Sequence, residues 1–171
     1  MLYLPEKYLV GFTYAVEVLG PDGNVQSIER VKNLMPAASI AYQMAAAWTG
    51  GTQYTSWYLS LFENNYTPVS SDTMTTLLAS AAENTTYTTT GGARLTFAPA
   101  EILNGTWSTA AAPSVFEFTV AATIRGAFIT SNVTRGNTSG LLVSAVKFAT
   151  AKSIEAGGAL RVPAGIALVA V

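Results

Sequence analysis

The side chains that could carry acid–base chemistry in this chain are its ten carboxylates, because the sequence contains no histidine and no cysteine. Two carboxylates on opposite sides of a groove can act as the acid and the base of a glycosidase. No spacing among the ten predicts such a pair, and Asp22 and Asp72 suit a turn and a helix start. We therefore expect that the protein is not an enzyme. The carboxylates are Glu6, Glu17, Asp22, Glu29, Glu63, Asp72, Glu83, Glu101, Glu117 and Glu155.

The missing residue types exclude several other kinds of site. Without histidine the chain lacks the usual general base near neutral pH and the commonest metal ligand. Without cysteine it forms neither disulfides nor thiolate metal sites. The glycine pairs at 50–51, 91–92 and 157–158 match no phosphate-binding motif. We expect no cofactor and no metal, although a calcium site built from scattered oxygen ligands stays open, with no residue that singles itself out.

Aromatic residues gather between Trp48 and Tyr66, and they suggest a different chemistry. Carbohydrate-binding modules stack sugar rings on exposed aromatic side chains, and Tyr54, Trp57 or Tyr66 could serve in this way. The alternative is that Trp48, at the end of a predicted helix, packs against Trp57 of a predicted strand. Helical spacing explains Trp48 and strand alternation explains Trp57, so we favour this structural interpretation.

The chain is poorly charged, and this bounds its partners. Only 11% of its residues are charged, against about 25% in typical soluble domains, and the net charge is −1. No basic run is present, so we expect no binding to nucleic acid. The longest weakly polar stretch, 37–48, is too short to span a membrane. The start, 1-MLYLPEK-7, does not have the pattern of a signal peptide.

A surface with so few charges gives weak protection against association. We take this as an indication that the protein belongs to an assembly. A soluble monomer with a threonine-rich surface remains the alternative.

The elements of the first half alternate between strand and helix patterns. Residues 8–32 predict a hairpin with its turn at 21-PDGN-24, where Pro and Gly supply the required backbone angles. Helices are predicted at 36–48 and 72–83, and a strand between them at 55–63.

The predicted helix 36–48 carries two kinds of stripe. Ile40, Met44 and Trp48 recur at i, i+4 and i+8. Alanines at 37, 41 and 45 form a small face that would allow close packing on a sheet or a neighbouring subunit.

From Ala93 onward the pattern is all-β. Alternating apolar residues predict a long strand at 114–130, with Phe116 to Phe128 on one face, and a last strand at 159–170. Pro163 cannot donate to a ladder, so we expect that last strand to be at an edge or bulged there. The other predicted strands are 94–98, 140–148 and 151–155.

Many amphipathic strands with few helices predict a mainly β fold. We expect a β-sandwich or jelly-roll-like barrel with one or two short flanking helices. Its core would bring the Phe116–Phe128 face against the Leu160–Leu168 face. We expect one compact unit, in which residues 1–32 form an N-terminal hairpin or arm and 33–171 form the sandwich.

Several segments of the chain resemble small β-sandwich virion proteins of tailed bacteriophages. They are 33-NLMPAASI-40, the Gly-Gly turn that follows, 55-TSWYLSLFENNYTP-68, and the region 126–162 with its GAF, LLVSAVKF and GGALRV pieces. In that group a short helix precedes a "WYLGLF"-like strand, and a strand ending in "GAF" leads through a turn to an "L-x-S-A-x-x-F" strand. The resemblance covers residues 33–162 and lies in turns and core positions.

This resemblance implies a virion structural protein, most specifically a capsid cement or decoration protein that stabilises the shell. A tail, collar or fibre component is the alternative. The implied partners are the major capsid protein or other virion proteins, with self-association, and the implied location is the virion, made in the host cytoplasm. We expect subunit contacts from the hairpin 8–32, the loop 64–71 and the turn 132–140. The contact residues that we predict there are Tyr8, Phe12, Tyr14, Tyr66, Pro68, Asn132 and Arg135.

Overall fold

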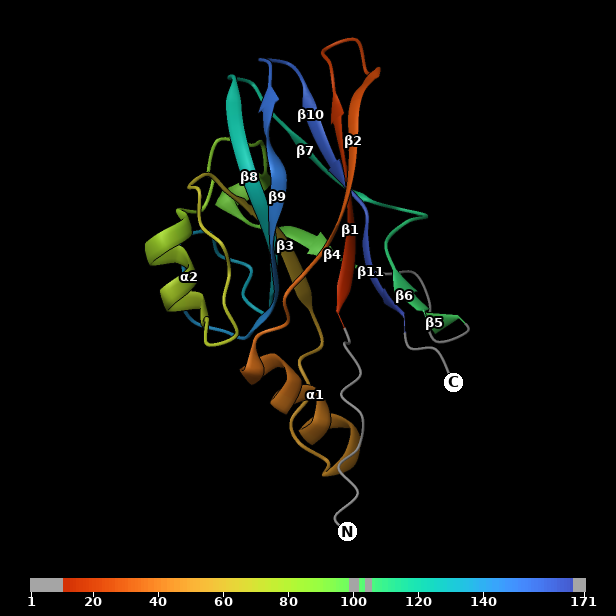
Figure 1. The fold of residues 1–171 in the computed structure, drawn as a ribbon, viewed down its shortest axis with the longest axis vertical. Helices are drawn as coiled ribbons and strands as arrows, with labels where there is room; N and C mark the ends of the chain where they lie inside the picture. The colour runs from red at the N-terminus through yellow and green to blue at the C-terminus, as the bar shows by residue number, and fades with distance from the viewer. Residues whose placement is uncertain (1–10, 99–101, 104–105, 168–171) are drawn as a thin grey trace.

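The computed structural model describes residues 11–98, 102–103 and 106–167, and in these residues the chain folds into two facing β-sheets with two flanking α-helices (Figure 1). This confirms the predicted mainly β, sandwich-like fold with short helices. The larger sheet, sheet A, contains β1 (Phe12–Leu19), β2 (Val25–Lys32), β5 (Ile102–Leu103), β6 (Thr106–Ser108), β7 (Ser114–Glu117), β10 (Ala159–Val162) and β11 (Ala164–Ala167). The smaller sheet, sheet B, has the order β4 (Leu95–Phe97), β3 (Trp57–Phe62), β8 (Ala122–Thr130), β9 (Leu142–Ile154).

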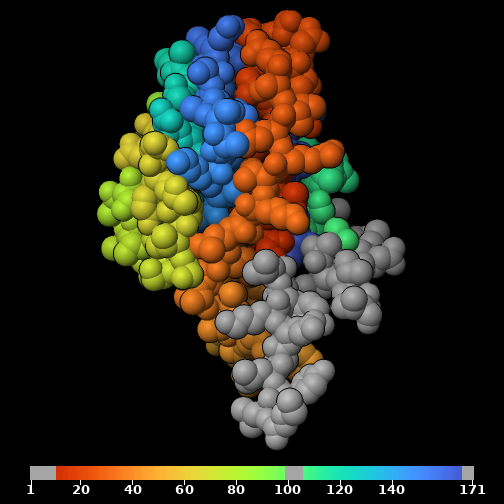
Figure 2. Space-filling view, viewed as in Figure 1, coloured from red at the N-terminus to blue at the C-terminus, as the bar shows by residue number. Residues whose placement is uncertain are grey.

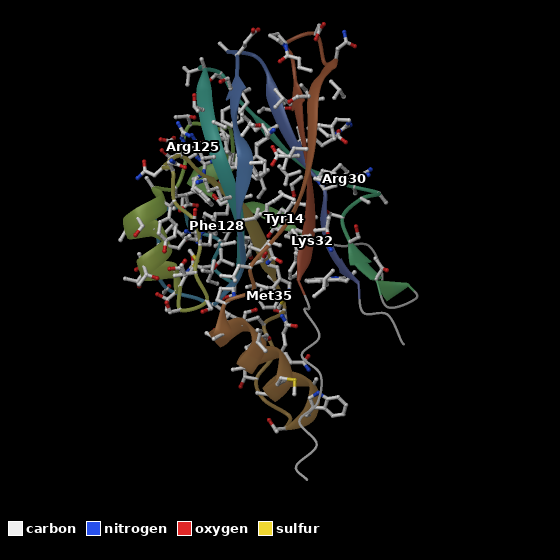
Figure 3. The ribbon with its side chains drawn as sticks, viewed as in Figure 1. Tyr14, Arg30, Lys32, Met35, Arg125 and Phe128 are labelled. Atoms are coloured by element: carbon white, nitrogen blue, oxygen red, sulfur yellow. The ribbon has the colours of Figure 1, made fainter. Side chains whose placement is uncertain are left out.

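The main core lies between the two sheets, where alternate residues of each strand meet. Along β1 the apolar side chains at 12, 14, 16 and 18 are all buried. They pack in one cluster with Leu160 and Val162 of sheet A and with Leu59, Leu61 and Ile129 of sheet B. Figure 3 shows Tyr14 between the sheets, and its hydroxyl lies 2.5 Å from the Ser144 hydroxyl of β9.

The predicted N-terminal hairpin is present, but it is part of the sandwich. Its turn has the expected geometry, with Gly23 at φ +76°. One edge of β1 pairs with β2, and the other edge pairs with β11 and then with β10. The hairpin is therefore not a projecting arm, because β1 is hydrogen-bonded on both sides inside sheet A. The predicted hairpin residues 8–10 lie outside the described residues.

The predicted strand 114–130 is divided between the two sheets, and this corrects the sequence analysis. Its first part is β7 in sheet A, its last part is β8 in sheet B, and Val120 in the crossing is 51% exposed. Phe116 is the ladder neighbour of Leu160 within sheet A, so the two predicted faces do not oppose each other as whole strands. A strand that switches sheets makes a corner of the sandwich, which keeps both halves over one core.

A β-bulge in β8 then reverses the inward face. The pairing of β8 with β9 shifts between Ile124 and Gly126. Ile124 and Ile129 consequently face the main core, whereas Phe128 faces α2 on the other side of sheet B (Figure 3). A Cβ atom at Gly126 would collide with the Phe62 ring and the Val146 carbonyl oxygen, so this close approach requires glycine.

The C-terminal strands also differ in their limits. The strands predicted at 140–148 and 151–155 form one strand, β9. The strand predicted at 159–170 breaks at Pro163 into β10 and β11, whose outer neighbours are β7 and β6. The expected irregularity at the proline is confirmed. Residues 168–170 of that prediction lie outside the described part of the chain.

The two α-helices lie close to their predicted places. Helix α2 (Met74–Ala81) begins after a capping box of Thr73 and Thr76 and packs Met74 and Leu77 on the outer face of sheet B. Helix α1 (Ala37–Trp48) lies at the end of the sandwich. A 3₁₀ turn, η1 (Thr90–Gly92), interrupts the connection from α2 to β4.

One charged clamp ties the edge of sheet A to sheet B. The Glu29 carboxylate of β2 accepts hydrogen bonds from the Lys152 ammonium (2.5 Å) and from the Ala149 N–H (2.6 Å) of β9. Partial burial opposes ionisation of Glu29, but these hydrogen bonds and the Lys152 charge outweigh it and hold the pKa of the carboxyl below its usual value. We name this contact the β2–β9 clamp.

Candidate interaction surface

Helix α1 presents an apolar stripe to the outside of the molecule. Ile40, Met44 and Trp48 are 49%, 57% and 79% exposed, and we name these three residues the α1 stripe. The only buried residue of the helix is Ser39. Figure 2 shows α1, in orange, below the strands at the end of the molecule. The stripe faces away from the sandwich, and the opposite face of the helix makes the contacts with the body.

Those contacts fix the helix from its inner side. The chain enters α1 through buried Met35 and Pro36, just after Leu34 forms a bridge with Ala145 of β9. Inside the helix, the Tyr42 ring lies edge-on to Trp57, with 5.9 Å between centroids. The Tyr42 hydroxyl also accepts a hydrogen bond from the Tyr54 N–H (2.6 Å).

The face of α1 that contacts the body is not the predicted one. We expected Trp48 to pack against Trp57, but the rings of Tyr42 and Tyr54 contact Trp57, and Trp48 is exposed. An apolar residue at every fourth position of a helix is consistent with either a buried or an exposed face, so periodicity alone did not decide which face contacts the body. A second signal was available: no charged residue occurs between Lys32 and Glu63.

A small apolar cavity lies between the inner face of α1 and the end of the sandwich. Its volume is about 260 Å³. Gln43 supplies the single amide of its wall. Such a cavity suits a small apolar or aromatic group. Its wall consists of Phe12, Tyr42, Gln43, Trp57, Trp107, Val143 and Ile166.

The turn 131–140 is held by a buried polar network, and this is the second notable region of the surface. The Arg94 guanidinium binds the Glu83 carboxylate through two hydrogen bonds of 2.7 and 2.8 Å, and both side chains are almost completely buried. Arg94 also donates to the carbonyl oxygens of Asn132 and Asn137. The Glu83 carboxylate accepts from the Gly136 N–H at 2.7 Å. One ion pair therefore anchors both ends of the turn.

Arg135 of the same turn adds a second anchor. Its guanidinium lies 3.8 Å from the centre of the Tyr87 ring and donates to the carbonyl oxygens of Thr85, Tyr87 and Ala93. Burial raises the pKa of the Tyr87 phenol, whose oxygen lies 3.0 Å from the Ser60 hydroxyl. We name the network of Glu83, Arg94, Arg135 and Tyr87 the turn clamp.

The predicted contact residues are mostly engaged inside this chain. Tyr8 lies outside the described residues. Phe12, Tyr14 and Pro68 are buried, so their side chains belong to the interior and offer no surface to a partner. The alternation predicted for the hairpin is present, but the residues predicted as contacts are on its inward face. Burial there raises the pKa of the Tyr14 phenol well above its ordinary value.

The remaining three contact residues are half-buried. The Tyr66 hydroxyl donates to the Asp72 carboxylate at 2.9 Å; burial first, and then this contact, raise the pKa of the phenol. The Asn132 side-chain oxygen accepts from the Thr134 N–H, and Arg135 belongs to the turn clamp. These residues shape the loops, and their contacts with another subunit stay a prediction.

The carboxylates of the described residues are spread over the molecule. No group of three Asp or Glu side chains in this part of the chain is close enough to hold a metal ion. None of the helices that the structure describes has the length and apolar character to cross a membrane. A shallow polar hollow lies beside the corner of the sandwich. Its wall consists of Glu63, Asn64, Asn84, Thr86, Ala121, Ala122, Thr123 and Arg125.

Comparisons with family models, with curated proteins and with solved structures gave no match to this chain.

Proposed function

We propose that this chain is a structural protein of a tailed-bacteriophage virion, specifically a cement protein that binds the outside of the capsid. The observation that carries the proposal is the exposed α1 stripe on a segment without charges. The resemblance of residues 33–162 to small virion sandwich proteins supplies the setting. The partners proposed are the major capsid protein and further copies of the chain, and the location is the virion.

A surface of this kind suits repeated contacts in a shell. Burying an uncharged apolar face requires no charge to be removed from water, so its contact is favourable without a matching ion pair. One such contact is modest, but the symmetry of a shell repeats it over many copies. The rigid sandwich behind α1 holds the stripe in one orientation, which limits the entropy lost on binding.

The experiment that tests this function is rebinding to shells assembled without the chain. Purified protein should sediment with such shells and raise the temperature at which they fall apart. Met44→Glu, in the stripe, should weaken binding by about tenfold or more because it would bury a charge. Val120→Glu, at an exposed site in the corner of the sandwich, is the matched control and should bind normally. Wild-type protein that never sediments with shells would refute the proposal.

A tail, collar or fibre component is the alternative place in the virion. The same stripe would then bind another virion protein. Immunogold labelling of particles separates the two places, since a cement protein labels the capsid and a tail protein labels one end.

A carbohydrate-binding module is a candidate from another class. Trp48, which is 79% exposed, would be a better sugar-stacking residue than those predicted from the sequence. Tyr54 and Trp57 pack edge-on against each other, with ring planes at 61°, so they do not form a flat platform. Tyr66 is tied to Asp72. A glycan array on which wild type binds nothing, or binds no better than a Trp48 variant, would dismiss this candidate.

A further inference from the structure

We propose that the α1 stripe pairs with the α1 stripe of a second copy, antiparallel, about a twofold axis that passes through Met44. This deepens the proposed function by naming which of its two proposed partners covers the α1 stripe: a further copy of the chain, so that each copy of the pair would bind the capsid protein through another surface. It rests on the proposed function only for its biological setting. Three features of the face favour this pairing: the spacing of the stripe, the absence of charge and the exposed area.

The spacing of the stripe is symmetric about its middle residue. Ile40 and Trp48 each lie four residues from Met44, which is about 6 Å along the helix axis. In an antiparallel pair Met44 would meet Met44 of the second copy, and each Ile40 would meet a Trp48. A twofold interface needs this self-complementarity, in which residue i contacts j and j contacts i.

The rest of the outer face permits two helices to come close. Ala37 and Ala41 are exposed beside the stripe, and their small side chains leave room for the larger residues of a facing helix. No charged residue lies in α1 or in the segment between Lys32 and Glu63, so two identical faces would not repel each other. Antiparallel helices also place opposite ends of their dipoles together.

The area of the face matches a weak dimer. With Ala37 and Ala41, the stripe exposes about 500 Å² per copy, so a pair would bury at most about 1,000 Å², near the lower bound for a specific interface. Most of the other exposed apolar residues are single valines on different elements, which provide no comparable face. We therefore expect a reversible dimer that forms at high concentration, as on a shell surface.

Cysteine cross-linking tests the geometry directly, because the natural chain has no cysteine. Met44→Cys alone should form a covalent dimer under mild oxidation, since the two sulfur atoms would meet at the axis. Ile40→Cys and Trp48→Cys should cross-link poorly alone and efficiently when the two variants are mixed. A parallel pair would instead cross-link each variant with itself, which would overturn the antiparallel arrangement.

Sedimentation at rising concentration tests the energetics. Wild type should shift from monomer to dimer, and Met44→Glu should raise the dissociation constant by about tenfold or more because two like charges would be buried together. Val120→Glu should dimerise like wild type. Circular dichroism of both variants confirms that they remain folded.

Two other occupants of the face would overturn the proposal. If Met44→Cys does not cross-link and its thiol reacts rapidly with an alkylating reagent, the face is open for a different protein. If the thiol reacts slowly in a monomer, another segment of the same chain covers it. These results are separable from the proposed function: a monomer that still binds shells refutes only the pairing, and a dimer that never binds shells refutes only the cement function.

Discussion

The turn clamp and the α1 stripe lie at two surfaces of the same sandwich, and they are built in opposite ways. In the turn clamp the ion pair of Arg94 and Glu83 is almost fully buried, and its charged groups are hydrogen-bonded to each other and to the turn. The stripe contains no ionic group, and its three large apolar side chains are exposed. The polar groups of the turn clamp find their partners within the chain, whereas the stripe exposes an apolar surface of a kind that is usually buried.

The turn clamp holds a loop through contacts within the chain, whereas the α1 stripe is a face that a partner can reach. The turn 132–140, within the region of the turn clamp, was an expected contact site. Arg135 of this turn instead binds carbonyl oxygens of its own chain, and Arg94 binds the carbonyl oxygens of Asn132 and Asn137 in the turn. A polar residue on a turn is therefore weak evidence for a contact, while an exposed apolar stripe is stronger evidence.

Breaking the ion pair of the turn clamp should have the largest effect. Glu83→Gln removes the charge that balances buried Arg94, and we expect a loss of about 3–5 kcal/mol in the free energy of unfolding. Urea unfolding followed by tryptophan fluorescence measures it. Glu117→Gln, at an exposed position of β7, is the control and should change stability by less than about 0.5 kcal/mol. Equal small effects in both variants would contradict the structural role of the clamp.

Replacing Arg135, the second arginine of the turn clamp, should destabilise the protein less. Lysine at 135 keeps the charge but cannot reproduce the planar fork that contacts three carbonyl oxygens and the Tyr87 ring. We expect Arg135→Lys to lower the free energy of unfolding by about 2 kcal/mol. Hydrogen exchange should show faster opening of the turn 131–140 than of β9. Unchanged exchange in the turn would show that the charge alone suffices.

The β2–β9 clamp is a partly exposed version of the same device, so its effect should be smaller and dependent on pH. Glu29→Gln should cost about 1–2 kcal/mol at neutral pH through the loss of charge-assisted hydrogen bonds. The pKa of Glu29 is lowered in the folded state, so its contribution is complete above the ordinary value of 4.5 and is lost as the pH falls through the lowered pKa.

Thermal unfolding of wild type and Glu29→Gln across acidic and neutral pH measures this difference. The two melting temperatures should converge as the pH falls below 4.5. A constant gap at every pH would show that the hydrogen-bond geometry of Glu29, and not its charge, stabilises the sheet edge.

The smallest effect on stability should come from the stripe itself. Met44 is 57% exposed, so Met44→Ser removes little buried surface and should change the free energy of unfolding by less than about 0.5 kcal/mol. Chemical unfolding at low protein concentration measures the monomer. A loss as large as that of the ion-pair variant would mean that the stripe is covered within its own chain, and the contrast between the two regions would disappear.

The sequence by itself determined most of the elements and the inward face of β1. Alternation along 12–18, the turn at Gly23 and the break at Pro163 follow from local backbone and side-chain preferences. The second helix does so in part: it was expected at 72–83 and spans 74–81, with its cap at Thr73. These properties depend only on residues close together in the chain, so the sequence is enough to predict them. The mainly β sandwich follows from them.

The tertiary structure decided which surfaces those elements share. Strand alternation over 114–130 could not show that the chain changes sheets near Val120, because the alternation of residue types continues through the crossing. Helical spacing could not show that the body contacts α1 through Tyr42 and leaves Trp48 outside. The carbonyl groups that Arg135 binds lie far away in the sequence. In the same way, only the folded chain determines whether an apolar face is buried or left open.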